Sequence, residues 1–179
     1  SLNLSSLRAS GFGANRFVLG RHGLGERVAE VNRAAVEIAT RAATGRAYVF
    51  GSIGPTGIML MMGDVSEEEL RQAFLVQANA LAEAGAAGLA IETMSDVNEA
   101  RLAVSAAAET GLPVVACMVY GSGRDHDRTM MGNTPEQAAA VLTDAGADVI
   151  GSNCGQGIEG FIPICRRLRA ATDRPVWIK

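Results

Sequence analysis

Helix-like and strand-like segments alternate strictly along this chain, and no other feature constrains its fold as much. Each predicted helix repeats apolar residues three to four apart, and most begin at a capping residue or end at a glycine. Each predicted strand is a short apolar run. We predict helices over residues 25–44, 66–84, 95–110, 134–146 and 159–172, and strands over residues 47–51, 89–92, 113–120, 149–152 and 175–178.

This alternation implies right-handed crossovers and a parallel sheet. Doubly wound sheets and (β/α)8 barrels share the pattern. No Gly-x-Gly-x-x-Gly fingerprint follows a first strand, and polar residues recur at the ends of several strands, so we favour the barrel. A full barrel takes about 250 residues, whereas this chain has 179. We therefore predict an α/β fold, an incomplete (β/α)8 TIM barrel, as a single domain over residues 1–179.

Composition and charge narrow the classes of partner. The net charge is −3 and only 4% of residues are aromatic, with no basic stripe, so we expect no nucleic-acid binding. No apolar run approaches the ~18–20 residues of a membrane span, and we expect no membrane association and no leader segment. Three cysteines form no dense framework, so we expect free thiols and a cytoplasmic location.

Two motifs at predicted strand ends carry candidate binding groups. Residues 51–57 read Gly-Ser-Ile-Gly-Pro-Thr-Gly, which fits either a substrate or anion loop or a plain turn that needs positive φ angles. Glu92 ends the strand over 89–92, where a carboxylate at a barrel mouth can bind an ammonium group. The alternative for Glu92 is a helix-capping or salt-bridged acid.

Cysteine chemistry gives the third candidate. Cys154 follows the strand over 149–152 and precedes a helix, a position that favours the thiolate, and thiolates bind zinc. The alternative is a small buried residue. We assign that buried role to Cys117 and Cys165. Without a Cys-x-x-Cys or a histidine cluster, the sequence shows no complete metal site.

Several segments together resemble the homocysteine-binding methyltransferase family, which includes the first module of cobalamin-dependent methionine synthase and betaine–homocysteine methyltransferase. The resemblance runs from about residue 11 to residue 179. The matching stretches are Phe-Gly-Ala-Asn-Arg at 12–16, Val-Asn-Arg-Ala-Ala-Val at 31–36, the 51–57 loop, Ile-Glu-Thr-Met-Ser-Asp at 91–96, Arg-Thr-Met-Met-Gly at 128–132 and Gly-Ser-Asn-Cys-Gly at 151–155.

The resemblance implies a zinc-dependent S-methyltransferase that methylates the thiol of homocysteine and so forms methionine. It implies zinc held by three cysteine thiolates, of which Cys154 is the first. It leaves the acceptor open to a similar small thiol and the methyl donor open between methylcobalamin and methyltetrahydrofolate, with a cobalamin-binding module as a candidate partner. No catalytic side chain is assigned. The implied substrate-binding residues are Glu92, Ser52, Gly54, Thr56 and Asn153.

Two departures from the family pattern qualify these expectations. The family's first strand has no counterpart in the sequence, and its paired cysteines on the eighth strand would lie beyond Lys179. We therefore expect the first and eighth strands to be missing, zinc binding to be weak, and this fragment to be inactive. Open barrel edges also make an oligomer a candidate arrangement.

Two alternatives stay open. One is a non-catalytic barrel remnant that acts as a binding or oligomerisation scaffold. The other is a different barrel enzyme, such as a phosphate-binding lyase that uses the 51–57 loop. Lys179 is the only lysine and the last residue, which argues against Schiff-base chemistry. We assign the methionine-containing runs at 59–62 and 130–131 to the apolar rim of the barrel.

Overall fold

The predicted apolar runs form one sheet in the computed structural model, which describes residues 5–155 and 157–179. All neighbouring strands are parallel and lie in the order β1-β2-β3-β4-β5-β6. The strands are β1 (Ser5–Ala9), β2 (Ala47–Ile53), β3 (Gly88–Met94), β4 (Val114–Met118), β5 (Val149–Ser152) and β6 (Val176–Ile178).

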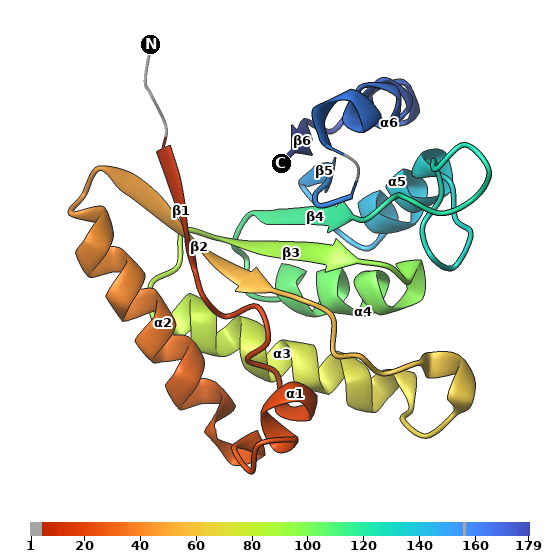
Figure 1. Cartoon of the computed structure of the whole chain (residues 1–179). Coiled ribbons are helices and arrows are strands. Elements are labelled where there is room, and N and C mark those ends of the chain that lie inside the picture. Colours follow the sequence, from red (N-terminus) through yellow and green to blue (C-terminus); the bar gives the residue numbers. More distant parts are fainter. Residues whose placement is uncertain (1–4, 156) are drawn as a thin grey trace.

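Helices connect these strands and lie along the outer side of the curled sheet (Figure 1). The capping residues expected at the helix starts are present: Ser66 forms a capping box with Glu69, Thr134 forms one with Gln137, and Asp96 caps the helix between them. The helices are α1 (Arg16–Gly20), α2 (Val28–Ala43), α3 (Glu67–Glu83), α4 (Val97–Ala108), α5 (Pro135–Asp144) and α6 (Gly157–Ala171), with short 3-10 turns η1 (Gly25–Arg27) and η2 (Leu60–Met62).

The strand order confirms the barrel prediction. A doubly wound sheet reverses its strand order at a switch point, whereas here every strand lies beside the next one in the sequence. The six strands curl into part of a barrel with the helices outside (Figure 1). The fold is therefore α/β and matches an incomplete TIM barrel.

The N-terminal strand corrects one part of the prediction. We expected no strand before residue 25, but Ser5–Ala9 forms β1 and pairs with β2 from Ser5↔Ala47 to Ala9↔Gly51. Within these five residues, Ala9 is buried and Leu7 is 37% exposed. An apolar alternation this short does not distinguish a strand from a loop. The hydrogen-bonded ladder with β2 stabilises β1, and the local sequence does not show that pairing.

The core lies between the sheet and the helices, and the alternation of side chains along each strand determines what faces the barrel interior. In β3, Leu89 and Ile91 pack into this core, whereas Ala90 belongs to a smaller cluster on the opposite face. Phe50 and Trp177 pack against that cluster, and their two rings meet edge to face with centroids 6.0 Å apart. Glu92 follows the same alternation as Ala90 and faces the barrel interior.

Two buried amides anchor the loop that follows β1. The Asn32 side chain donates to the carbonyl oxygens of Ala14 and Val28, both at 2.8 Å. The Gln77 side chain donates to the Gly11 carbonyl oxygen at 2.6 Å. Because both amides are fully buried, these bonds replace lost contacts with water. They tie the loop that carries Phe12 to α2 and α3.

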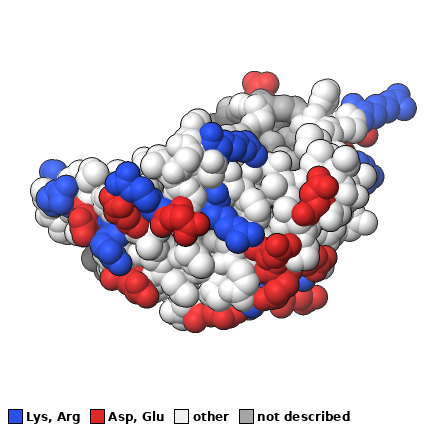
Figure 2. Space-filling model, turned by 90° about the horizontal axis from the view of Figure 1, so that it is seen from below, with Lys and Arg blue, Asp and Glu red and all other residues white. Residues whose placement is uncertain are grey.

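The surface over the outer helices mixes charges of both signs. Figure 2 shows acidic and basic side chains interspersed on this face. Two ion pairs connect α3 with α4. Arg71 of α3 pairs with Glu109 directly after α4, and Arg101 of α4 pairs with Glu67 of α3. Among the described residues, no helix is long and apolar enough to cross a membrane.

Candidate functional site

A hollow of about 330 Å³ opens where the carboxyl ends of the strands meet inside the curled sheet. This end of a parallel barrel is where active sites are built. Polar and apolar groups from strand ends far apart in the sequence share the hollow, which we call the strand-end cavity. Its lining residues are Arg8, Ala9, Ser10, Phe12, Ser52, Glu92, Thr93, Asn153, Cys154 and Lys179.

Glu92 lies at the polar end of the strand-end cavity and is 7% exposed. Its Oε1 accepts a hydrogen bond from the Ser52 hydroxyl. Its Oε2 forms an ion pair with the Arg8 guanidinium and accepts from Lys179 Nζ at 3.1 Å. A carboxylate this buried requires such partners. The structure therefore brings Ser52 and Glu92 into direct contact, 40 residues apart in the chain.

Asn153 joins the ends of β3 and β5. Its side-chain oxygen accepts from the Thr93 backbone N–H at 2.8 Å, and its Nδ2 donates to Thr93 Oγ1 at 2.7 Å. The same Nδ2 lies 3.4 Å from Cys154 Sγ. Asn153 is 1% exposed, so its own amide group is shielded from water. The Asn153 amide therefore fixes the position of the Cys154 thiol relative to the end of β3.

The backbone is strained at both ends of this contact. Thr93 has φ of 63° and Cys154 has φ of 58°, a left-handed conformation that non-glycine residues seldom adopt. The β3–β4 register also shifts between Ile91 and Met94, and such irregularities re-aim side chains near active sites. Thr93 and Cys154 are 61 residues apart. Both left-handed residues thus lie at or just beyond the carboxyl end of a strand.

The sequence predicted buried roles for Cys117 and Cys165, but Cys165 is only partly buried. Cys154 is exposed and lines the strand-end cavity, whereas Cys117 is buried in β4. Burial, with a smaller contribution from the charge of Glu92, raises the pKa of the Cys117 thiol to about 12. Within residues 5–155 and 157–179, no group of three His, Cys, Asp or Glu side chains is placed to hold a metal ion. The described residues therefore do not complete a zinc site.

Two predicted binding residues of the 51–57 loop do not line the strand-end cavity. Gly54 lies under Phe12, where an added Cβ would come within 2.5 Å of the Phe12 ring. Thr56 is fully buried and donates from both its backbone N–H and its hydroxyl to Glu99 Oε1, at 2.8 and 2.6 Å. Gly54 thus makes room for a cavity residue, and Thr56 belongs to a neighbouring cluster.

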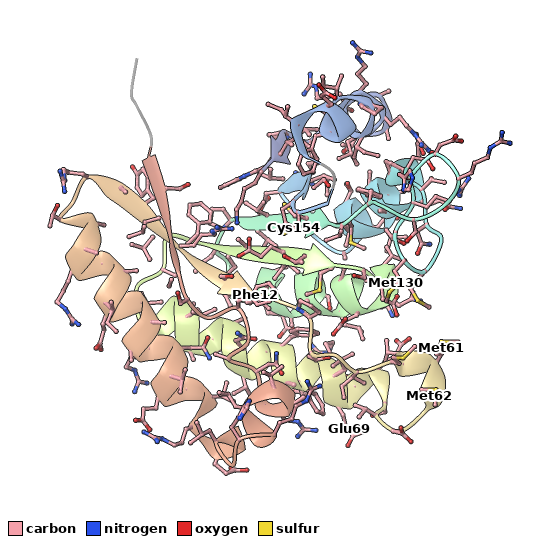
Figure 3. All side chains as sticks on the ribbon, in the orientation of Figure 1. Phe12, Met61, Met62, Glu69, Met130 and Cys154 are labelled. Carbon is pink, nitrogen blue, oxygen red and sulfur yellow. The ribbon has the colours of Figure 1, made fainter. Side chains whose placement is uncertain are left out.

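That cluster borders a second hollow of about 290 Å³, formed by the loops after β2 and β4. Figure 3 places Met61, Met62 and Met130 together on the side of the molecule away from β1, apart from Cys154. Burial raises the pKa of Glu99 at the base of this hollow, and the two hydrogen bonds from Thr56 offset part of that rise. We call it the methionine hollow; it is lined by Pro55, Gly57, Ile58, Met59, Leu60, Met61, Ser95, Asp96, Glu99, Met130 and Met131.

Sequence reasoning missed Arg8, Thr93 and Lys179, among other residues of the cavity lining. Arg8 lies on the unpredicted strand β1, and its contact with Glu92 spans 84 residues. Lys179 was considered only for Schiff-base chemistry, and Thr93 only as part of a motif. A period-two pattern in Ser6-Leu7-Arg8-Ala9 is the one signal that could have placed Arg8 on the inner face.

The chain is similar to known methyltransferases. Residues 6–179 match the family described as Homocysteine S-methyltransferase. Over 126 residues the chain is 34% identical to betaine–homocysteine S-methyltransferase 1 of Danio rerio, a match that covers 70% of this chain and 30% of that relative. Over 128 residues it is 35% identical to S-methylmethionine–homocysteine S-methyltransferase BHMT2 of Rattus norvegicus, covering 71% and 34%. The chain therefore spans about a third of the length of these curated relatives.

A solved structure shows the same fold. The metallated form of the homocysteine methyltransferase MmuM from Escherichia coli superimposes with a TM-score of 0.81 at 20% identity. The superposition covers 99% of this chain and 67% of that one. At this identity the likeness establishes the fold and leaves the chemistry to the residues of the site.

Proposed function

The chain belongs to the homocysteine S-methyltransferase family, and we propose that it forms the homocysteine-binding part of an enzyme that methylates the homocysteine thiol to give methionine. The two curated relatives are named for different methyl donors, betaine and S-methylmethionine, but for the same acceptor. That shared acceptor supports homocysteine as the substrate of this cavity.

One observation carries the proposal. Ser52, Glu92, Asn153 and Cys154 come from three different strand ends and line one cavity. A carboxylate and a thiol in the lining of one cavity suit a ligand that has an ammonium group and a sulfur atom. Such convergence of polar groups at the carboxyl ends of barrel strands is the usual arrangement of a barrel active site.

We assign the roles from these contacts. Glu92 holds the substrate ammonium, and the Ser52 hydrogen bond orients the Glu92 carboxylate. Phe12 forms an apolar wall of the cavity. In the reaction, the homocysteine thiol loses its proton to solvent and its sulfur attacks the methyl carbon of the donor. The new S–C bond forms as the donor–methyl bond breaks, and the bonding electron pair leaves with the donor.

Cys154 is our candidate zinc ligand. A zinc site that binds a substrate thiol needs three protein ligands, and the described residues supply one at this cavity. We therefore propose that the other two come from residues outside those described here. The Asn153 contact at 3.4 Å would hold the Cys154 sulfur in place for this role.

The methyl donor, the partner, the domain bounds, the location and the oligomeric state are also proposals. Methylcobalamin and methyltetrahydrofolate remain the predicted donors, with a cobalamin-binding module as a partner, alongside the donors named for the relatives. We keep the single domain over residues 1–179, the cytoplasmic location and pairing through the sheet edges as predictions. Residues 1–4 of that domain lie outside the described residues.

Calorimetric titration with homocysteine tests the proposal. We expect Glu92→Gln to weaken binding about tenfold or more, because a charge-assisted hydrogen bond to the ammonium is lost. The matched control is Glu37→Gln on the exposed face of α2, which should leave binding unchanged. Equal affinity of the Glu92→Gln variant and the unsubstituted chain would contradict the assigned role.

Zinc binding provides a separate test. In equilibrium dialysis we expect weak zinc binding that Cys154→Ser reduces further, while Cys165→Ser has no effect. Zinc binding that is unchanged by Cys154→Ser would remove this residue from the metal site without affecting the assignment of Glu92.

A further inference from the structure

Around Glu92, unused hydrogen-bond donors outnumber unused acceptors. A carboxylate offers about four lone-pair positions, and Ser52, Arg8 and Lys179 occupy three of those on Glu92. The Arg8 guanidinium has five N–H donors. One of its nitrogens, Nη1, contacts Glu92, and it makes no other hydrogen bond among the described residues. This end of the cavity can therefore bind an anionic group through more hydrogen bonds than a cationic one.

The charges point the same way. Two cations, Arg8 and Lys179, share the single carboxylate of Glu92, so this cluster carries a net charge of +1. The side chains of Arg8 and Glu92 are 32% and 9% exposed. One cation would suffice as the counterion of Glu92. Placing a second, partly desolvated cation beside it costs free energy unless another anion binds there. The remaining cavity side chains that the structure describes carry no formal charge.

We propose that Arg8 binds the carboxylate of the amino-acid substrate and thereby selects amino-acid thiols over simple thiols. This inference rests on the proposed function, because it concerns the same ligand. The planar guanidinium fork matches a carboxylate in a bidentate manner. The substrate ammonium then takes the remaining acceptor capacity of Glu92, and Lys179 adds a second positive charge beside the bound carboxylate.

The topology supports this orientation of the ligand. Arg8 lies on β1 and Cys154 follows β5, so the two residues come from strands on opposite sides of the central strand β3. The curl of the sheet brings both to the strand-end cavity, with Glu92 and Thr93 of β3 also in its lining. A ligand with a carboxylate at one end and a sulfur at the other would extend from Arg8 toward Cys154.

A comparison of three ligands tests the role of Arg8. Calorimetric titrations use homocysteine, homocysteamine, which lacks the carboxylate, and sulfanylbutanoate, which lacks the amine. We expect Arg8→Gln to weaken homocysteine and sulfanylbutanoate about tenfold or more and homocysteamine less than about twofold. Arg8→Lys should recover part of the loss, because it keeps the charge without the fork. Arg41→Gln, on the exposed surface of α2, is the control and should change none of the three affinities.

The outcomes separate this inference from the proposed function. If homocysteine binds but Arg8→Gln weakens all three ligands equally, Arg8 has only a structural role and the inference is wrong. If Arg8→Gln tightens the two amine-containing ligands, Arg8 competes with the substrate for Glu92 and the inference is also wrong. If the unsubstituted chain binds neither homocysteine nor its analogues, the proposed function fails and the inference fails with it. Circular dichroism of each variant confirms that the fold is retained.

Discussion

The strand-end cavity and the methionine hollow lie at the same end of the sheet but are built in opposite ways. The first is formed largely by strand ends, and its side chains are connected by hydrogen bonds from Ser52 to Glu92 and from Asn153 to Thr93. The second is formed mainly by loops, and its methionine side chains are long, unbranched and largely exposed, such as Met61 at 73% and Met130 at 68%. One is a polar site with fixed geometry, and the other is an apolar surface that can adapt its shape.

The strand-end cavity contains backbone conformations that lower stability and fix its geometry, whereas the methionine hollow does not. Left-handed φ angles at Thr93 and Cys154 each cost about 1–3 kcal/mol and persist only where the surroundings hold them. Nothing comparable constrains the methionine hollow, where the left-handed residues at 57 and 63 are glycines. Substitutions should therefore affect the two regions very differently, and the following predictions test that contrast in order of expected effect.

The largest effect is expected beneath the strand-end cavity, at Gly151. A Cβ there would lie 2.1 Å from the Trp177 carbonyl oxygen and 2.8 Å from Cys117 Sγ. Gly151→Ala should therefore separate β5 from β6 and lower the free energy of unfolding by about 3 kcal/mol, measured by urea denaturation. Gly20→Ala, where an added Cβ meets no atom within 4 Å, is the control and should cost little. Equal stability of the two variants would show that the floor of the cavity is not tightly packed.

A smaller loss is expected at Asn153. Asn153→Ala removes both hydrogen bonds to Thr93 and leaves the Thr93 backbone N–H without its partner. We expect a loss of about 2–3 kcal/mol in the free energy of unfolding. Asn98→Ala, at an exposed position on α4, should stay within about 0.5 kcal/mol of the parent chain. A similarly small change at Asn153 would show that the left-handed backbone does not depend on the amide.

Glu99 gives the methionine hollow a pH dependence. Burial raises its pKa in the folded chain, so the unfolded chain releases this proton at lower pH than the folded chain does. The free energy of unfolding should therefore fall as pH rises through the ordinary carboxyl range, until Glu99 ionises in the folded chain too. Glu99→Gln should flatten this part of the stability–pH curve, with a change smaller than that for Asn153→Ala.

Thr56→Val serves as the matched variant for Glu99. It removes the hydroxyl that donates at 2.6 Å and lowers the Glu99 pKa, so the decline with pH should become steeper. Denaturation at several pH values distinguishes the variants. An unchanged slope in Glu99→Gln would mean that another group causes the decline.

The smallest effect is expected at the rim of the methionine hollow. Met61→Gln replaces an apolar side chain that is 73% exposed, and stability should change by less than about 0.5 kcal/mol. Met94→Gln, at a fully buried position, provides the contrast and should cost several times more. A large loss from Met61→Gln would show that the hollow is packed as tightly as the core.

Much of the architecture was predictable because its signals are local. The capping boxes at Ser66 and Thr134 and the apolar runs of the central strands lie within a few residues of one another, and the structure contains them as expected. The short strand β1 and the helix α1 were not predicted, because five residues carry too little periodic signal. The ladder that stabilises β1 comes from a strand distant in the sequence, with pairing from Ser5↔Ala47 to Ala9↔Gly51.

The site was predictable only in part for the same reason. Glu92 and Cys154 could be recognised as strand-end residues, but the ion pair of Glu92 with Arg8 depends on how 84 intervening residues fold. Thr56 looked like a binding residue in the 51–57 loop, yet the structure turns it toward Glu99. Spacing within a motif does not determine on which side of a loop a hydroxyl lies.

The sequential strand order gives the strand-end cavity a gradient of local opening. β3 and β4 lie in the middle of the sheet and are almost entirely buried, whereas among the described residues β1 and β6 are each paired on one side only. Backbone amides of β3 should therefore exchange with deuterium through the rarest opening events, and those of the edge strands through frequent ones. Arg8 and Lys179 lie at the edges and Glu92 in the middle, so transient fraying would release a cation from Glu92 while the carboxylate itself stays in place.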